Sequence, residues 1–337
     1  MSEKILTISV ASYNTEKFIR KTMDSLIIPE IMDKLEVLIV NDGSADRTLE
    51  IAREYEAKYP NTFRAINKPN GGYGSTINKA VEIAEGRYIK TIDGDDWVNR
   101  EGLIKLITFL ENTSADMVIT NFARVNDKNG KVSYTNFDFL DVGVVKSFDA
   151  MYNNHELYMQ ALAIKVSIYR DHCINITHHC FYTDIEYIMY PCPYIETVAY
   201  LDTCVYMYRV AVNEQSMSIN GKRKHIDEQR KILGNIIEYY KRNLESDSLT
   251  DGQKKYFDVV INNMVKSHIT AILSLKRNSH NHVRMIDFNS FIFNEVPEIY
   301  ERGNKSLFVK MARNGNYMLY WMESIAFEVF CKIRTNF

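Results

Sequence analysis

The sequence predicts an α/β protein with a mostly parallel central sheet, followed by an α-helical C-terminal region. In the first 120 residues, short β-rich runs alternate with segments of helical spacing. Strands separated by helices of this length are typical of a parallel, mostly buried sheet. After about residue 215 the alternation stops and only helical spacing continues. We therefore predict two domains, residues 1–215 and residues 216–337.

The individual elements follow from apolar runs, helical spacing and turn residues. Strands are expected at residues 5–11, 35–40, 63–66, 88–92 and 117–120, and helices at residues 15–26, 48–59, 75–84 and 101–112. Residues 122–145 are polar and hairpin-like around Asp127-Lys128-Asn129-Gly130. The tyrosines of residues 182–208 are interpreted mainly as core and strand packing, with stacking of one or two of them on an acceptor sugar as the alternative. In the second domain, helices are expected at residues 224–243, 252–276 and 307–334.

Composition narrows the class of protein. The hydrophobic share of 46% and charged share of 25% are ordinary for a soluble globular chain. A net charge of −2 without a basic stripe predicts no nucleic-acid partner. Five cysteines without C-x-x-C spacing predict neither a disulfide framework nor a zinc site. The start Met1-Ser2-Glu3-Lys4 lacks the basic and apolar regions of a signal peptide, so none is expected. No run of about 20 uncharged apolar residues occurs, so no membrane-spanning helix is expected. We expect a cytoplasmic protein.

Three carboxylates follow directly on an expected strand. Asp93-Gly94-Asp95-Asp96 comes after residues 88–92, and Asn41-Asp42-Gly43-Ser44 comes after residues 35–40. Ligands collect at the carboxyl ends of strands in an open α/β sheet, and clustered carboxylates suit Mg²⁺ or Mn²⁺. The alternative is that each run only forms a turn or caps the next helix. The two strand ends together predict a nucleotide-plus-metal site, although the glycine patterns of dinucleotide folds and P-loops are absent.

An ordered set of motifs carries a family resemblance. It runs from Ala11-Ser12-Tyr13-Asn14 through Asn41-Asp42-Gly43-Ser44 and Asn70-Gly71-Gly72 to Asp93-Gly94-Asp95-Asp96-Trp97. This order and spacing resemble family 2 glycosyltransferases, inverting enzymes with the GT-A nucleotide-sugar-binding fold. The match covers about residues 4–120 and continues more loosely to about residue 218. The family often has proline where Ala11 stands, a difference that affects turn rigidity more than chemistry.

The resemblance implies a divalent cation, Mn²⁺ or Mg²⁺, and a UDP-linked sugar donor. Asp95 and Asp96 are expected to hold the cation, with the division of roles among these two and Asp93 left open. Asp42 looks like the residue that hydrogen-bonds the base. Ser12 and Asn14 either line the nucleotide pocket or form a strand-end turn, and Arg209 with Ser216 is expected to close over the diphosphate. The expected donor-binding residues are Ser12, Asn14, Asp42, Asp93, Asp95 and Arg209.

The acceptor hydroxyl needs a positioned general base, and the candidate is Asp184, with Glu186 in reserve. One displacement of this kind inverts the anomeric centre. The late acidic motif of the family is usually Glu-Asp, whereas Thr183 precedes Asp184 in this chain. The alternative is that Thr183 and Asp184 only cap a helix.

These residues together predict an inverting, metal-dependent transferase that moves a sugar to a glycan or lipid-linked glycan acceptor in cell-surface polysaccharide synthesis. The alternative is a non-catalytic nucleotide-sugar-binding partner in a glycan assembly complex. A sugar nucleotidyltransferase is not expected, because such an enzyme needs glycine and basic residues in its N-terminal loop. Residues 9–15 contain neither.

A C-terminal apolar stripe has two interpretations. Its residues fall at three- and four-residue spacing among basic side chains, as on one face of a helix. It either packs on the preceding helices or on a second subunit, or it lies in an anionic membrane surface at the inner face of the membrane. The stripe consists of Met318, Met322, Ile325, Ala326, Val329, Phe330 and Ile333.

Overall fold

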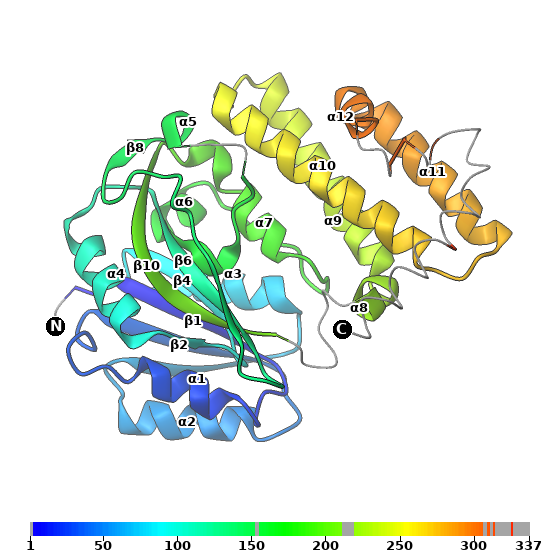
Figure 1. The fold of residues 1–337 in the computed structure, drawn as a ribbon. Helices are drawn as coiled ribbons and strands as arrows, with labels where there is room; N and C mark the ends of the chain where they lie inside the picture. The colour runs from blue at the N-terminus through cyan, green and yellow to red at the C-terminus, as the bar shows by residue number, and fades with distance from the viewer. Residues whose placement is uncertain are drawn as a thin grey trace. The chain divides into compact units, whose positions relative to one another are not determined.

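The computed structural model describes residues 3–151, 155–210, 219–305, 309–310, 313 and 325. Among these residues, ten strands form one sheet with the order β3-β2-β1-β4-β9-β6-β10-β5, and β7 and β8 pair with β6 and β10 (Figure 1). The strands are β1 (Leu6–Ser12), β2 (Leu35–Asp42), β3 (Phe63–Lys68), β4 (Tyr88–Asp93), β5 (Trp97–Val98), β6 (Met117–Asn126), β7 (Val132–Thr135), β8 (Val145–Ser147), β9 (Leu162–Lys165) and β10 (Thr197–Val210).

The long ladders of the sheet are parallel. Strand β1 lies between β2 and β4 and pairs in parallel with both, β2 pairs in parallel with β3, and β6 pairs in parallel with β10. Every residue of β1 and β2 is buried, as expected for apolar runs covered on both faces. The predicted α/β fold with a mostly parallel sheet is confirmed. The short antiparallel strands β5, β8 and β9 were not predicted, because two to four residues show no periodicity.

Helices cover both faces of this sheet. In Figure 1, α1 and α2 lie together below β1 and β2, while α3, α6 and α7 lie above them. Apolar residues at helical spacing face the sheet, for example Leu103, Leu106, Ile107 and Leu110 of α4. The helices of this part are α1 (Ile19–Leu26), α2 (Thr48–Lys58), α3 (Tyr73–Ile83), α4 (Arg100–Asn112), α5 (Phe148–Met151), α6 (Val166–Asp171) and α7 (Asp184–Met189), with short 3-10 turns η1 (Met159–Ala161) and η2 (Cys192–Tyr194).

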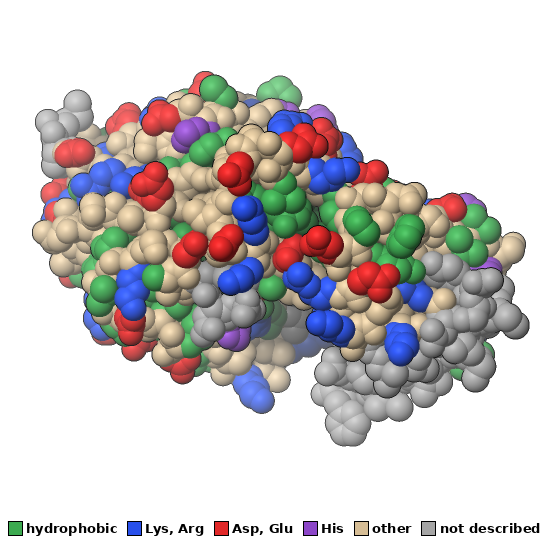
Figure 2. Space-filling model, turned by 90° about the horizontal axis from the view of Figure 1, so that it is seen from above, with side chains coloured by type: hydrophobic (Ala, Val, Ile, Leu, Met, Phe, Trp, Pro, Cys, Tyr) green, Lys and Arg blue, Asp and Glu red, His purple; other side chains and the backbone are tan. Residues whose placement is uncertain are grey.

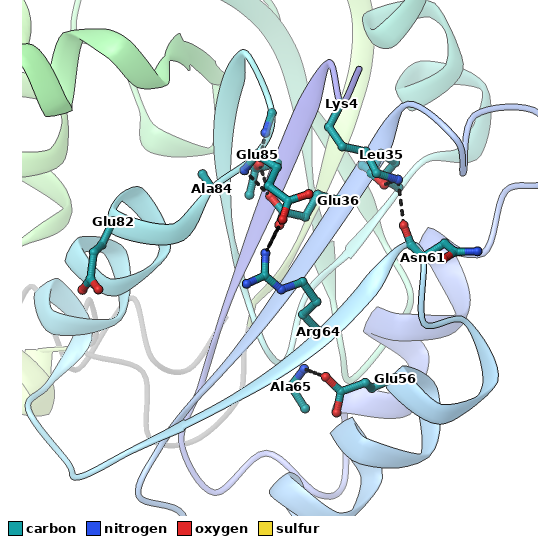
Figure 3. A network of polar contacts seen from close by, with 12 residues as sticks. Lys4, Leu35, Glu36, Glu56, Asn61, Arg64, Ala65, Glu82, Ala84 and Glu85 are labelled. Atoms are coloured by element: carbon teal, nitrogen blue, oxygen red, sulfur yellow. Dashed lines mark hydrogen bonds and ion pairs between the residues drawn. The ribbon is translucent and has the colours of Figure 1, made fainter. Parts of the chain in front are cut away.

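A buried polar network holds the amino ends of the strands (Figure 3). The opposite edge of the sheet carries the loop with Asp93, Asp95 and Asp96, called the acidic loop from here on. Glu36 is 2% exposed and accepts hydrogen bonds from Thr7 Oγ1 over 2.6 Å and from the backbone N–H of Glu85 over 2.7 Å. Arg64 pairs with the same carboxylate over 2.7 Å. The network ties β1, β2, β3 and the end of α3 together, so the opposite strand ends keep a defined register.

Contacts within the chain separate two compact units, residues 1–213 with 250–253, and residues 214–249 with 254–337. The described part of the second unit is helical: α8 (Ile219–Lys224), α9 (Ile226–Glu245), α10 (Asp251–Leu273), α11 (Ser279–Glu295) and α12 (Pro297–Gly303). Tyr240 of α9 stacks on Phe257 of α10 with ring centroids 5.1 Å apart. The predicted helical C-terminal region is confirmed for these elements, and α11 and α12 were not predicted.

Apart from Ile325, which is 51% exposed, the predicted C-terminal stripe lies outside the described residues. Within the described part of the chain, every helix is too short or too polar to cross a membrane. On the face seen in Figure 2, the acidic and basic side chains of the described residues are interspersed.

Candidate active site

The loop between β4 and β5 gathers three carboxylates at the carboxyl edge of the sheet. The backbone N–H of Asp96 donates to Asp93 O over 3.0 Å and closes a tight turn. The N–H of Gly94 donates over 2.9 Å to Ala11 O, at the end of the neighbouring strand β1. Asp93, Asp95 and Asp96 each offer a carboxylate oxygen, and these oxygens lie within 4.8 Å of one another. This spacing and the oxygen-only donor set fit one hard divalent cation.

Asp96 anchors this loop from the inside. It is 1% exposed, and Tyr206 of β10 donates its hydroxyl hydrogen to Asp96 Oδ2 over 2.6 Å. The backbone N–H of Arg209 donates to Asp96 Oδ1 over 2.6 Å. Both oxygens of Asp96 therefore accept hydrogen bonds from β10, while the side chains of Asp93 and Asp95 remain partly exposed.

The electrostatics of the loop favour cation uptake. Burial, then the charge of Asp95, raises the pKa of Asp93 to about 7, against the lowering effect of hydrogen bonds from Tyr73 and Tyr206. Burial raises the pKa of Asp95 as well, and burial with the charges of Asp93 and Asp95 raises the pKa of Asp96 well above its ordinary value. Close carboxylates repel one another when ionised, and a bound cation removes that repulsion.

Asp42 holds the glycine turn that precedes α3. The N–H groups of Gly71 and Gly72 donate to its two carboxylate oxygens over 2.9 and 2.8 Å, and Lys68 Nζ donates to Oδ1 over 2.5 Å. The Asp42 side chain is 4% exposed. Gly72 has φ +80°, and a Cβ there would lie 3.0 Å from the backbone nitrogen of His179, so glycine suits this close approach. In this structure Asp42 shapes the turn, and its predicted contact with a nucleotide base stays a prediction.

Ser12 and Asn14 occupy the end of β1 beside the acidic loop. Ser12 is 1% exposed, and a Cβ at Gly94 would lie 2.9 Å from Ser12 Oγ. Asn14 is exposed at φ +53°, a conformation that asparagine tolerates. Its side-chain oxygen accepts from the N–H of Ala45 over 2.9 Å, and its own N–H donates to Ser44 Oγ over 2.9 Å. Asn14 therefore joins the loops after β1 and β2.

Asp184 lies at the start of α7, and its charge reaches the acidic loop. Burial is the main cause of the raised pKa values of Asp93, Tyr73 and Tyr208, and the charge of Asp184 adds to each of them. Burial raises the pKa of Asp184 itself, against hydrogen bonds from its own backbone N–H and that of Ile185. A carboxylate with a raised pKa is a better proton acceptor near neutral pH.

Glu186, the reserve candidate, is fully buried and serves the fold. Its Oε2 accepts from the backbone N–H of Thr177 over 2.8 Å, and Oε1 accepts from Thr177 Oγ1 and from the Tyr190 hydroxyl, both over 2.9 Å. Two residues after Thr177, the N–H of His179 donates to Gly71 O over 2.6 Å. Glu186 therefore supports the segment that lies on the glycine turn.

The Arg209 side chain is buried beside the acidic loop. It is 7% exposed, its Nε donates to Asp95 O over 2.8 Å, and its guanidinium pairs with Asp127. The guanidinium also lies 4.8 Å from the ring centre of Phe18 and 5.2 Å from that of Trp97. Ser216, its expected companion over the diphosphate, lies outside the described residues.

Three tyrosines that interact with the acidic residues, by hydrogen bond or through charge, were not among the predicted site residues. Tyr206 binds Asp96, Tyr73 hydrogen-bonds Asp93, and Tyr208 has a raised pKa from burial and from the charges of the acidic loop. Their signal in the sequence was the two-residue spacing of Tyr206 and Tyr208, which places both on one face of a strand. The second signal was the position of Tyr73 directly after the turn formed by Gly71 and Gly72.

Comparison with known proteins agrees with this architecture. The family model described as Glycosyl transferase family 2 matches residues 7–178. The putative glycosyltransferase EpsH of Bacillus subtilis is 35% identical over 162 residues, which cover 48% of this chain and 44% of EpsH. Chondroitin synthase of Pasteurella multocida is 32% identical over 152 residues, 45% of this chain and 15% of that enzyme. The chain thus spans less than half the length of these two relatives.

Solved structures share the fold over nearly the whole chain. S. aureus TarS residues 1–349, in complex with UDP-GlcNAc, has a TM-score of 0.70 at 20% identity, covering 96% of this chain and 91% of that one. The mannosyltransferase PcManGT from Pyrobaculum calidifontis, in complex with GDP-Man and Mn²⁺, has a TM-score of 0.52 at 13% identity, covering 98% and 89%. At these identities the likeness shows the fold alone.

Proposed function

This chain belongs to glycosyl transferase family 2, and on that premise we propose that it transfers a sugar from a UDP-linked donor to a glycan hydroxyl with Asp184 as the general base. One observation carries the proposal. Three carboxylate oxygens lie within 4.8 Å of one another at the carboxyl edge of the sheet. Burial, and after it the charges of Asp95 and Asp184, raises the pKa of Asp93 in this loop. Inversion of the anomeric centre is general to the family.

The reaction is a single displacement. The acceptor hydroxyl oxygen forms a bond to the anomeric carbon as the bond from that carbon to the donor phosphate oxygen breaks. The hydroxyl proton passes to the carboxylate of Asp184, and the nucleoside diphosphate leaves on the opposite face of the sugar. A general base of this kind contributes about 10²–10⁴-fold to the rate.

Asp95 and Asp96 are the proposed cation ligands, with Asp93 beside them. A bound Mn²⁺ or Mg²⁺ would neutralise the negative charge that develops on the leaving diphosphate. Asp95 is the more open of the two ligands, since Asp96 is 1% exposed and accepts hydrogen bonds from β10 on both oxygens. The Mn²⁺ in the PcManGT complex supports a divalent cation for this fold.

The donor nucleotide is proposed to bind at the ends of β1, β2 and β4. Ser12 and Asn14 form one wall, Asp42 and its glycine turn form the other, and Asp93 and Asp95 face the ribose and diphosphate. The UDP-GlcNAc in the TarS complex supports a UDP-linked donor. Arg209 is paired with Asp127 here, so we propose that it supports the diphosphate side of the site through the backbone of Asp95.

The product is proposed to be a cell-surface polysaccharide, built on a glycan or lipid-linked glycan. Residues 1–215 are the proposed transferase domain, and residues 216–337 are proposed to contact the acceptor, a second subunit or a membrane surface. Flotation with anionic liposomes tests the membrane contact, because a chain truncated after Gly303 lacks the C-terminal stripe and should stay at the bottom of the gradient.

The test of the catalytic proposal is release of nucleoside diphosphate. UDP-, GDP- and dTDP-linked sugars would be offered with Mn²⁺ or Mg²⁺, and release is expected from a UDP-sugar. Addition of EDTA and the substitution Asp95→Asn should each abolish release of the nucleoside diphosphate. Asp171 is an exposed aspartate on α6, so Asp171→Asn is the control and should leave release unchanged. Donor binding without release from any of them would favour the non-catalytic alternative. Normal release in EDTA would overturn the metal role.

A further inference from the structure

The face of the sheet beside the candidate base carries a row of aromatic and basic side chains. In the parallel ladder between β6 and β10, Phe122 lies opposite Tyr206, and Arg124 lies opposite Tyr208. Residues opposite each other, and residues two apart on one strand, share a face of a sheet. These four side chains therefore lie on one face, the face on which the Tyr206 hydroxyl reaches Asp96.

This row borders the proposed reaction centre on two sides. Tyr206 donates to Asp96 over 2.6 Å. Burial, and after it the charges of the acidic loop and of Asp184, raises the pKa of Tyr208. On the other side, the Tyr73 hydroxyl lies 3.1 Å from Met159 Sδ, and Tyr158 is the residue before Met159. The ring centres of Tyr158 and Phe122 are 5.5 Å apart, edge to face.

Arg124 is the positively charged residue among these four side chains. Its guanidinium lies 4.9 Å from the ring centre of Phe122 and 5.7 Å from that of Tyr158, and Nη1 donates to Thr135 Oγ1 over 2.6 Å. No carboxylate of the described residues forms an ion pair with Arg124, whose side chain is partly exposed. The guanidinium has five N–H donors in a plane, so several remain available for a ligand.

We propose that Arg124 and Tyr158 form an acceptor subsite for a glycan that carries a negative charge close to the hydroxyl that is glycosylated. This inference rests on the proposed function, since it names the class of acceptor for the same site. The planar fork of arginine binds a phosphate or a carboxylate through two parallel hydrogen bonds. Tyr158 is 36% exposed and offers a ring against which a sugar can lie. The rings behind Arg124 hold its guanidinium in position before the acceptor arrives.

The experiment compares wild type, Arg124→Gln and Arg53→Gln. Arg53 is exposed on α2, so its substitution removes the same charge away from the row. Each protein is applied to a glycan array of neutral, uronic-acid-containing and phosphate-containing oligosaccharides. The retained glycans then serve as acceptors in a UDP-release assay at saturating UDP-sugar. The two acidic sets distinguish a carboxylate acceptor from a phosphate acceptor.

Wild type is expected to retain one of the two acidic sets of glycans. For Arg124→Gln, both the retention of those glycans and kcat/KM with them as acceptors should be at least about 10-fold lower. Arg53→Gln should match wild type, neutral glycans should be affected less than about twofold, and Arg124→Lys should recover part of the loss. Preference of wild type for neutral glycans, or equal retention of acidic glycans by Arg124→Gln, would overturn the inference. So would a raised KM for the donor alone, which would place Arg124 at the diphosphate.

Array retention does not depend on turnover. A failure of the proposed function therefore shows separately, as absent UDP release from a chain that still retains acidic glycans.

Discussion

Tyr206 binds both ends of the acidic loop at once. Its hydroxyl donates to Asp96 Oδ2 over 2.6 Å and accepts from the backbone N–H of Asp93 over 3.1 Å. The phenol is fully buried, and Tyr206 follows Asp96 by 110 residues in the sequence. The position of the three carboxylates therefore depends on β10 as much as on β4.

Tyr206→Phe should weaken cation binding by about 10- to 100-fold, because one hydrogen bond to a charged group contributes about 1.5–3 kcal/mol. A Mn²⁺ titration of activity measures the shift in the half-activating concentration. Tyr88→Phe is the matched control, since Tyr88 is also fully buried and donates to Ala115 O over 2.7 Å, away from the loop. Equal titration curves for both variants would show that the phenol does not position the cation ligands.

Asp184→Asn should lower kcat by about 10²–10⁴-fold, because asparagine keeps the shape of the side chain and cannot accept the hydroxyl proton. Donor affinity and the free energy of unfolding should change little, since the side chain is partly exposed at a helix start. Steady-state kinetics with separate donor and acceptor titrations measure the split. Loss of donor affinity at unchanged kcat would instead put Asp184 in the nucleotide pocket.

Glu186→Gln should give the opposite pattern. The Glu186 carboxylate accepts hydrogen bonds from Thr177 and Tyr190 inside the protein. Its replacement should therefore cost about 1–3 kcal/mol in the free energy of unfolding. Urea unfolding measures this loss, and kcat per folded molecule should fall far less than in Asp184→Asn. A large fall in kcat with normal stability would make Glu186 the base.

Asp42→Asn should destabilise the chain and weaken donor binding, because amide nitrogen cannot replace the second acceptor oxygen of the glycine turn. The loss in free energy of unfolding should be about 1.5–3 kcal/mol. Binding of UDP, GDP and dTDP would be compared by calorimetry. A loss confined to uridine nucleotides marks a direct contact with the base, and an equal loss for all three marks the turn.

Lys90 predicts a pH dependence of stability. It is fully buried on β4, its ammonium donates to Gln160 O over 2.7 Å, and burial lowers its pKa to about 7 from an ordinary 10.5. Between these two values the unfolded chain binds a proton that the folded chain does not, so stability should rise with pH across that window. Below pH 7 both states are protonated and the contribution is at its minimum.

Urea unfolding of wild type and Lys90→Met at pH 6.5, 8 and 9.5 tests this linkage. The slope for one proton is at most about 1.4 kcal/mol per pH unit. Wild type should gain stability relative to Lys90→Met as the pH rises. Parallel curves for the two proteins would mean that Lys90 keeps its ordinary pKa.

Local sequence patterns were sufficient to predict the central strands of the sheet and the acidic residues at their carboxyl ends. The strands β1, β2 and β4 are visible in the sequence as short apolar runs. Asp42 lies at the end of β2, and Asp93-Gly94-Asp95-Asp96 lies at the end of β4. Because the carboxyl ends of parallel strands meet at one edge of a sheet, their proximity could be inferred without a structure. Asp184 was singled out from a short motif as well, the resemblance to the late acidic motif of the family, and its role as the base stays a prediction.

The tertiary structure decided what each polar group is free to do. Asp184 and Glu186 are two residues apart on α7, yet Asp184 acts on the acidic loop while Glu186 is fully buried on Thr177 and Tyr190. The pairing of β6 with β10 brings together residues about 80 positions apart in the sequence. The ion pair of Arg209 with Asp127 and the hydrogen bond of Tyr206 to Asp96 both involve residues of β10. Sequence spacing fixes the face of a side chain on its own element, but burial and hydrogen-bond partners come from segments brought together only by the sheet.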